Sequence, residues 1–206
     1  MRYFLLPIIF LFFVNADTNN IDTSSFDYGK IMPIEFSYIN TKDDGALYHM
    51  GIGIGGFLEY DLFELQLSFN FIRFRSSDTL FYWNDKMPQF GDTFKWGGTI
   101  FYKLSSHWQI GVDYSKYIFG TNEGKLEGGT TYGYMSSYGL KFLYDPLADI
   151  MEQDEPLLMV FLLGYINAPN ITYKEEIRET YNYSYIVEKR YDLSGPIVTF
   201  GLMKKF

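Results

Sequence analysis

The side chains in this chain that could do chemistry are nine polar residues, each of which alternates with apolar neighbours. They are Glu35, Glu64, Gln66, Asn70, Lys95, Lys103, Gln109, Asp113 and Lys141. Because alternate residues of a β-strand point to the same side, we expect them to face one common interior space. Carboxylates and ammonium groups gathered there can pair, or they can line a narrow gated pore. A buried charge without a partner is costly, so we expect a salt-bridged polar network, with the pore as the alternative.

The two histidines, His49 and His107, are the other candidates for catalysis or metal binding. They lie far apart in the sequence and the chain has no cysteine, so it lacks the usual ligand set of a dedicated metal site. His49 alternates with Gly51, Gly53 and Gly55, which predicts that it points into a crowded interior. We expect no metal and no cofactor.

The elements that position these residues are strands with period-two alternation. In residues 63–71 every odd position is aromatic or aliphatic and every even position is polar. Residues 156–166 are apolar at both parities, so their facing is ambiguous. Apart from the N-terminal stretch, the longest apolar run is 157–164, which is too short for a transmembrane helix. Any membrane crossing must therefore use strands.

The N-terminal residues have the layout of a secretory signal peptide. Arg2 precedes an apolar stretch at 4–14, and Ala16 is a small residue at the expected cleavage point. We therefore expect a cleaved signal peptide at 1–16, a flexible periplasmic lead-in at 17–29 and one strand-rich domain at 30–206, with an uncut anchor as the alternative. The absence of cysteine excludes disulfides and a lipid-modified N-terminal cysteine. With 25 acidic against 17 basic residues, we expect no nucleic-acid partner.

The last strand-like segment, 195–206, ends on an aromatic residue. Four of its apolar residues share one parity, and Lys204 interrupts the series; the four are Val198, Phe200, Leu202 and Phe206. A terminal Phe on an alternating strand resembles the assembly signal of bacterial outer-membrane β-barrels. With this segment the strand count reaches eight, and a closed bacterial barrel needs an even number.

The connections and the aromatic residues agree with such a barrel. Residues 76–92, 119–129 and 168–194 would be long outer loops, and 59–61 and 105–107 tight periplasmic turns. The short 43–45 hairpin and the longer 145–155 segment depart from this rule. Outward-facing Tyr and Trp near the strand ends, such as Trp96 and Trp108, are typical of membrane interfaces.

In architecture, residues 30–206 resemble the small eight-stranded outer-membrane barrels of the OmpA transmembrane domain and OmpX type. The expected fold class is all-β, an antiparallel up-and-down transmembrane β-barrel. The resemblance implies a monomer in a Gram-negative-type outer membrane, in contact with lipid and lipopolysaccharide. It also implies insertion by the barrel assembly machinery, which reads the C-terminal strand.

The resemblance implies no single activity, because this family includes adhesins, anchors, small pores and lipid A enzymes. The lipid A enzymes of similar size use a His with a Ser and an acidic partner. Neither His49 nor His107 has the His-x-Ser pattern at a lipid-facing position, so we expect no catalytic residue.

The last outer loop is the most individual segment, since charged residues alternate there with tyrosines. The tyrosines that could form a binding surface are Tyr173, Tyr181, Tyr183, Tyr185 and Tyr191. Their alternation predicts a hairpin that protrudes beyond the membrane and could bind a surface protein by strand addition. A solvated loop without a partner is one alternative. A ten-stranded barrel is another, although it would turn Glu175 and Glu179 toward lipid.

Together these features predict a non-enzymatic outer-membrane protein that serves envelope stability or adhesion through its loops. A narrow passive channel is the first alternative, followed by a lipid A-modifying enzyme. A soluble secreted β-barrel is also open, because alternation does not reveal which face points inward.

Overall fold

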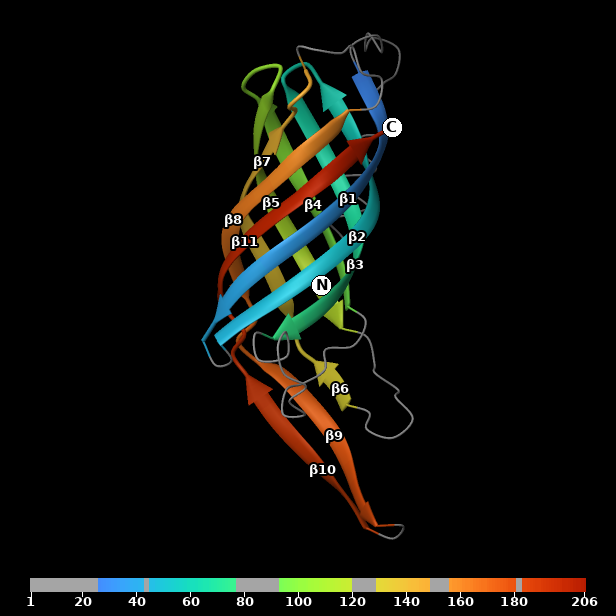
Figure 1. The fold of residues 1–206 in the computed structure, drawn as a ribbon, viewed down its shortest axis with the longest axis vertical. Helices are drawn as coiled ribbons and strands as arrows, with labels where there is room; N and C mark the ends of the chain where they lie inside the picture. The colour runs from blue at the N-terminus through green and yellow to red at the C-terminus, as the bar shows by residue number, and fades with distance from the viewer. Residues whose placement is uncertain (1–25, 43–44, 77–92, 120–128, 149–155, 181–182) are drawn as a thin grey trace, which may run out of the picture.

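The computed structural model describes residues 26–42, 45–76, 93–119, 129–148, 156–180 and 183–206. Eight antiparallel strands close into a barrel in the order β1-β11-β8-β7-β5-β4-β3-β2, and three others form a separate sheet that projects from one end (Figure 1). The expected eight-stranded up-and-down barrel is confirmed. The ten-stranded alternative is wrong, because β9 and β10 pair in the separate sheet and not within the barrel wall.

The barrel is built from long strands that follow the predicted alternation. They are β1 (Phe26–Thr41), β2 (Gly45–Tyr60), β3 (Phe63–Ser76), β4 (Thr93–Lys103), β5 (Trp108–Phe119), β7 (Met135–Tyr144), β8 (Leu157–Asn167) and β11 (Gly195–Lys205). The projecting sheet comprises β6 (Gly129–Tyr132), β9 (Ile171–Thr180) and β10 (Tyr183–Tyr191). Strand β1 starts within the predicted lead-in, and the predicted signal peptide lies outside the described residues. Across the described residues, no helix is long and apolar enough to cross a membrane.

The first and last strands close the barrel. Their register runs from Ile31 opposite Lys205 to Ile39 opposite Ile197. Phe206 extends this pairing, because the Lys30 amide donates to the Phe206 carbonyl at 3.1 Å and the Phe206 amide donates to the Lys30 carbonyl at 3.0 Å. Phe206 therefore lies at the same end as the tight β2–β3 and β4–β5 connections, which we call the turn end. The projecting sheet marks the opposite end, the hairpin end (Figure 1).

The alternation sorts polar residues to the inside of the barrel and apolar residues to the outside. In β3, Glu64, Gln66 and Asn70 are buried, whereas Phe63 and Phe69 are exposed. The same parity holds around the wall, so large aliphatic and aromatic side chains cover the exterior. A soluble β-barrel has the reverse arrangement. The ambiguous strand β8 is resolved as well, with Leu158, Val160, Leu162 and Ile166 pointing inward.

Two apolar clusters lie inside the barrel, one near each end. The hairpin-end cluster is formed by the inward residues that lie nearest the hairpin end. Its members include Ile39, Leu47, Ile72, Phe74, Met135, Ile166 and Ile197. The turn-end cluster contains Ile31, Phe101, Leu143, Leu158, Val160 and Met203, with Phe57 packed against it. The charged interior residues lie between and beside these clusters, and buried hydroxyls such as those of Thr41 and Thr93 lie near the hairpin end.

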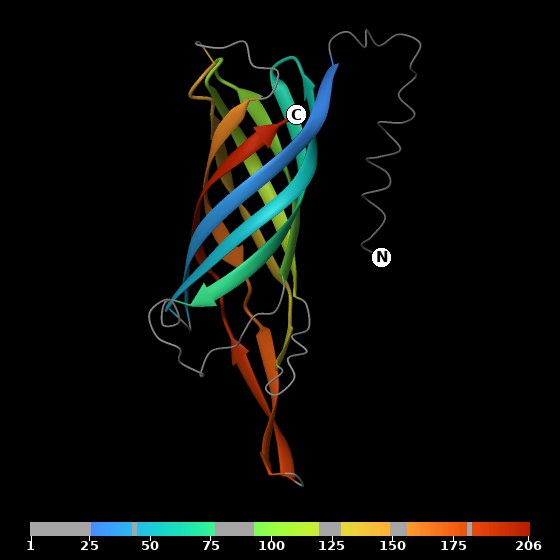
Figure 2. The same cartoon turned by 45° about the vertical axis from the view of Figure 1, so that its right-hand side comes forward.

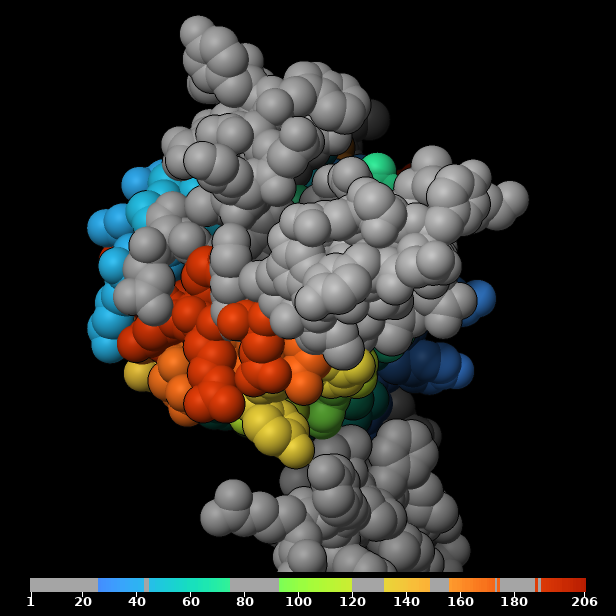
Figure 3. Space-filling model, turned by 90° about the horizontal axis from the view of Figure 1, so that it is seen from below, coloured from blue at the N-terminus to red at the C-terminus, as the bar shows by residue number. Residues whose placement is uncertain are grey.

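A short neck connects the barrel to the projecting sheet (Figure 2). The Leu193 amide donates to the Ala168 carbonyl at 3.0 Å, and the Ala168 amide donates to the Ser194 hydroxyl at 2.9 Å. Ile171 and Leu193 are buried in the hairpin-end cluster, so the root of the sheet shares the barrel's core. The predicted protruding hairpin is therefore confirmed, with β6 added to it as a third strand. The strand order in this sheet is β10-β9-β6. Figure 3 shows the molecule from the hairpin end, with C-terminal residues (orange and red) beside residues from the middle of the chain (yellow).

Candidate functional site

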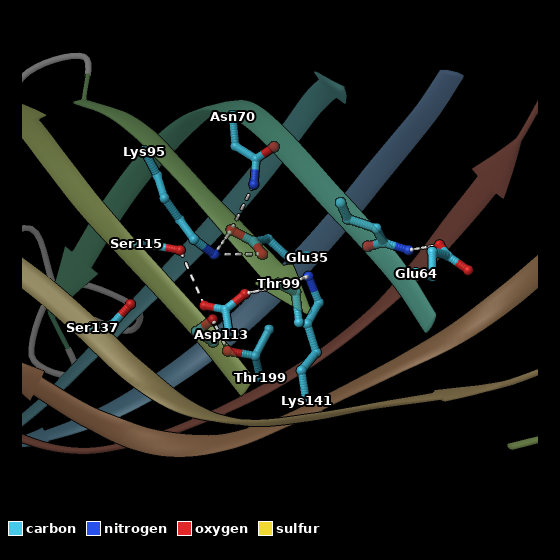
Figure 4. A network of polar contacts seen from close by, with 12 residues as sticks. Glu35, Glu64, Asn70, Lys95, Thr99, Asp113, Ser115, Ser137, Lys141 and Thr199 are labelled. Carbon is cyan, nitrogen blue, oxygen red and sulfur yellow. Dashed lines mark hydrogen bonds and ion pairs between the residues drawn. The ribbon is translucent and has the colours of Figure 1, made fainter. Parts of the chain in front are cut away.

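The centre of the barrel interior holds a buried ion pair between β1 and β4. The Lys95 ammonium lies 2.6 and 2.8 Å from the two carboxylate oxygens of Glu35 (Figure 4). The Asn70 amide on β3 donates to the same carboxylate at 3.2 Å. Space for this group comes from β2, because a Cβ at Gly53 would collide with the Asn70 amide. Gly53 of β2 therefore makes room for a polar side chain from the neighbouring strand.

A second group surrounds Asp113 on β5. The Thr99 and Ser115 hydroxyls donate to its carboxylate at 2.7 and 3.1 Å. The Lys141 ammonium on β7 lies 3.6 Å from the same carboxylate, so this ion pair is looser than that of Glu35 (Figure 4). The register places Thr99 opposite Asp113, which explains why the short hydroxyl can reach it.

A third group lies at the turn end around Glu64. Its carboxylate receives hydrogen bonds from the Lys205 ammonium at 2.6 Å and the Gln66 amide at 2.7 Å. Lys205 also lies 3.9 Å from Glu59, which pairs with Lys103. The last strand of the barrel is thereby linked across the interior to β2 and β3.

These three groups balance their charges. Within the described interior, each of four carboxylates (Glu35, Glu59, Glu64 and Asp113) has a lysine within 4.0 Å, and the lysines number four as well (Lys95, Lys103, Lys141 and Lys205). Pairing of this kind offsets part of the cost of removing charge from water. An eight-stranded barrel has an interior that side chains can fill. Together with the apolar clusters, the paired groups form a plug.

Several buried polar atoms in the plug lack a hydrogen-bond partner among the described residues. They are both ring nitrogens of His49 and the side-chain oxygens of Gln66, Asn70 and Gln109. The His49 ring is fully buried, with its centroid 5.3 Å from that of Phe74 and 6.2 Å from that of Tyr117. Buried polar atoms of this kind commonly bind ordered water.

The structure places all nine predicted interior residues on the inward parity, divided among these groups. Glu35, Asn70 and Lys95 form the first, Asp113 and Lys141 belong to the second, and Glu64 and Gln66 to the third. Lys103 pairs with Glu59, and Gln109 lies opposite it on β5. Sequence reasoning missed Lys205 and Glu59. The parity of Lys205, opposite to that of Phe206, was the signal that could have found it.

The two histidines lie in different environments. His49 is inside the barrel as expected, whereas His107 lies in the exposed β4–β5 turn, with Nδ1 3.0 Å from the Ser106 hydroxyl. Among the described residues, no group of three or more His, Cys, Asp or Glu side chains is placed to hold a metal ion.

The C-terminal strand presents its apolar residues outward. Phe200, Leu202 and Phe206 are exposed and Val198 is half-buried. Lys204 shares their parity, and its ammonium lies 4.6 Å from the centroid of the Phe206 ring. The lysine that interrupts the motif is thus next to the chain end, where it can reach water.

The predicted tyrosine surface is distributed along the projecting sheet. Tyr173, Tyr183 and Tyr185 occupy strand positions in β9 and β10, and Tyr181 lies outside the described residues. Tyr191 is half-buried against the hairpin-end cluster, so it contributes to the root of the sheet. The described charged residues of the sheet are paired on its surface, with Lys174 3.1 Å from Glu188.

Comparisons with known proteins add little to this description. No protein-family model matches the chain, and no curated protein matches it in sequence. Among solved structures, the outer membrane protein OprG from Pseudomonas aeruginosa is 13% identical, with 86% of this chain and 96% of that chain covered and a TM-score of 0.38. The β domain of the Bordetella autotransporter BrkA is 10% identical, with 88% and 100% covered and a TM-score of 0.25. Both TM-scores are below 0.5.

Proposed function

We propose that this protein is a monomeric bacterial outer-membrane β-barrel without enzymatic activity, which anchors a projecting binding sheet on the cell surface. The observation that carries the proposal is the polarity of the barrel wall, with paired charges inside and large apolar side chains outside. A wall of this polarity is stable in lipid, because a closed barrel also satisfies every backbone hydrogen bond within its wall.

The exterior supports a membrane location in more detail. Exposed aliphatic residues such as Ile52, Ile54 and Val112 lie in the middle of their strands. Exposed aromatic residues such as Tyr60, Tyr102 and Trp108 lie near the turn end. Amphipathic aromatic rings of this kind prefer the boundary between lipid and water.

The plugged interior favours an anchoring role over transport. The described lumen has no surplus charge, and apolar clusters lie near both of its ends. A narrow passive channel is the second candidate, and the observation in its favour is the set of buried polar atoms without partners. Those atoms need only local water molecules and not a continuous path.

The projecting sheet supports the binding role. Strand β10 pairs with β9 on one side, and no described strand pairs with its other side. A free strand edge is a template for an extended segment of another protein. The charged residues Lys174, Glu188 and Arg190 on the sheet are exposed, which suits a solvated surface that binds a partner transiently.

The experiment is trypsin treatment of intact cells that express the protein, followed by membrane fractionation. We expect the folded chain in the outer membrane, shifted on gels between unheated and boiled samples, and cleaved within residues 174–190. The matched control replaces Lys174, Arg178, Lys189 and Arg190 with glutamine, and it should resist cleavage there. A chain recovered in the soluble fraction, or a hairpin cleaved only after cell lysis, would contradict the proposal.

A further inference from the structure

The apolar exterior of the barrel gives way to polar side chains near the hairpin end, and one group of them lies on β5, β7 and β8. The register places Lys116 of β5 beside Trp96 of β4 on one side and Ser136 of β7 on the other. Ser136 in turn pairs with Asn167 of β8. All four residues are on the outward parity. Three polar side chains therefore follow one another across three adjacent strands, next to the apolar part of the wall.

Lys116 differs from every lysine of the interior in its electrostatic surroundings. Among the described residues it has no carboxylate partner. Its ammonium instead lies 5.7 Å from the centroid of the Trp96 ring, a cation–π contact. An aromatic face attracts a cation but leaves its charge uncompensated. Lys116 is thus available to an anion from outside the chain.

The surroundings of Lys116 form a pocket of about 670 Å³ between the outer wall and the base of the projecting sheet. Its lining includes Trp96, Lys116, Tyr132, Tyr134, Ser136 and Asn167. Tyr134 is 91% exposed and Tyr132 is 54% exposed, so their rings are available for contact. A concave site that combines aromatic rings with a few polar groups is the usual form of a small-ligand site.

The level of the pocket along the barrel limits the kind of ligand. Lys116 precedes the last residue of β5, Phe119, by three positions, which is about 10 Å along the strand. In a membrane-spanning barrel this is the region where lipid headgroups meet the hydrocarbon core. On the side away from the hairpin end, the row is bordered by the outward rings of Tyr114 and Tyr138.

We propose that this pocket binds one lipid with a phosphorylated headgroup. The Lys116 ammonium pairs with the phosphate, Ser136 and Asn167 hydrogen-bond to neighbouring headgroup oxygens, and an acyl chain lies along the aromatic wall. The uncompensated cation selects for phosphate, and the opening onto the apolar wall selects for a lipid over a soluble phosphate. This inference depends on the proposed outer-membrane location.

The test uses the full chain, folded in uncharged maltoside detergent, with bound lipids counted by native mass spectrometry. The probes are a monophosphorylated lipid A, the same lipid without its phosphate, and inorganic phosphate. The variants are Lys116→Gln, Lys116→Arg and the matched control Lys30→Gln, which removes an exposed outward lysine at the turn end. Each variant is first checked for the band shift between unheated and boiled samples, which reports a folded barrel.

We expect the wild-type chain to retain one phosphorylated lipid, as do Lys116→Arg and Lys30→Gln. Lys116→Gln should bind it about tenfold more weakly, because a charge-assisted contact is lost. Equal retention of the lipid without phosphate, equal binding by Lys116→Gln, or equally tight binding of inorganic phosphate would overturn the inference while the folded barrel stands. Absence of the band shift in the wild-type chain would instead contradict the proposed function, before any lipid is added.

Discussion

The barrel interior and the projecting sheet use the same ion-pair chemistry in opposite environments. Lys95 and Glu35 are 2.6 Å apart and both buried, whereas Lys174 and Glu188 are 3.1 Å apart and both exposed. Buried charges depend on their partners, because water cannot replace a partner that is removed. Exposed charges are already solvated, so their pairing adds little. We therefore expect the interior pairs to maintain the barrel and the sheet pairs to leave the surface free for binding.

The largest effect is expected from breaking the central pair. Lys95→Met leaves the Glu35 carboxylate buried with only the Asn70 amide, so the free energy of unfolding should fall by about 3–5 kcal/mol. The measurement is urea unfolding of the barrel in lipid vesicles. The double variant Glu35→Leu with Lys95→Met removes both charges and should recover most of the loss. If Lys95→Met alone unfolds like the wild type, the interior charges do not hold the barrel together.

A smaller loss is expected at the turn end. Lys205→Met removes the ammonium 2.6 Å from Glu64, but the Gln66 amide still donates to that carboxylate. We expect a loss of about 2 kcal/mol in the same urea assay. Lys204→Met is the matched control, because Lys204 faces outward one residue earlier in β11 and should change stability far less. Equal losses in the two variants would argue against the inward role of Lys205.

The looser pair of Lys141 with Asp113 should give a still smaller effect. Lys141 is 3.6 Å from Asp113, which keeps hydrogen bonds from the Thr99 and Ser115 hydroxyls. Lys141→Met should therefore cost about 1 kcal/mol of unfolding free energy. A loss as large as that of Lys95→Met would show that the two hydroxyls do not sustain the Asp113 charge.

The smallest effect is expected on the projecting sheet. Hydrogen bonding to Lys174 and its charge hold the pKa of Glu188 below its ordinary value. A carboxyl group whose pKa is lowered by folding stabilises the folded state at pH values above its unfolded-state pKa. That contribution is lost as the pH falls through the lower, folded-state pKa. Because Glu188 is solvated, Lys174→Gln should leave the unfolding midpoint at neutral pH unchanged, in line with salt screening.

The measurement that detects this small effect is an NMR titration of the Glu188 side-chain carboxyl. In Lys174→Gln its pKa should move up toward the ordinary glutamate value, while the urea midpoint stays in place. A lower urea midpoint of Lys174→Gln at neutral pH would contradict this, because it would show that the exposed pair stabilises the fold as the buried pairs do.

Much of the fold could be predicted from the sequence because period-two alternation is a local signal. The parity of residues 63–71 predicted β3 and its facing, and the C-terminal Phe indicated that the apolar side is the outer one. Strand β8 could not be oriented in this way, because both of its faces are apolar and only pairing with β7 and β11 fixes its inward side. Strand β6 was not predicted as a separate strand, and its residues lie where a predicted loop meets a predicted strand. Four residues are too few to show a periodicity, and their pairing with β9 is non-local.

The sequence predicted which residues point into the barrel interior, but it did not predict which charged residues form ion pairs with each other. Parity alone gives the side of the wall, whereas the partner of each charge depends on the register between strands. Lys205 shows this most clearly, because its partner Glu64 is 141 residues away in the chain. The outward row of Lys116, Ser136 and Asn167 was not found from the sequence for the same reason, as its members lie on three strands.

Recording of the wild-type barrel in planar lipid bilayers tests the central claim most directly, because a plug of paired charges capped by apolar clusters should not conduct ions. We predict that the inserted chain gives no discrete conductance steps, with insertion verified by the band shift of the reconstituted protein. Reproducible steps that change size in Lys95→Met would contradict the account, since they would show that ions pass the Glu35–Lys95 pair.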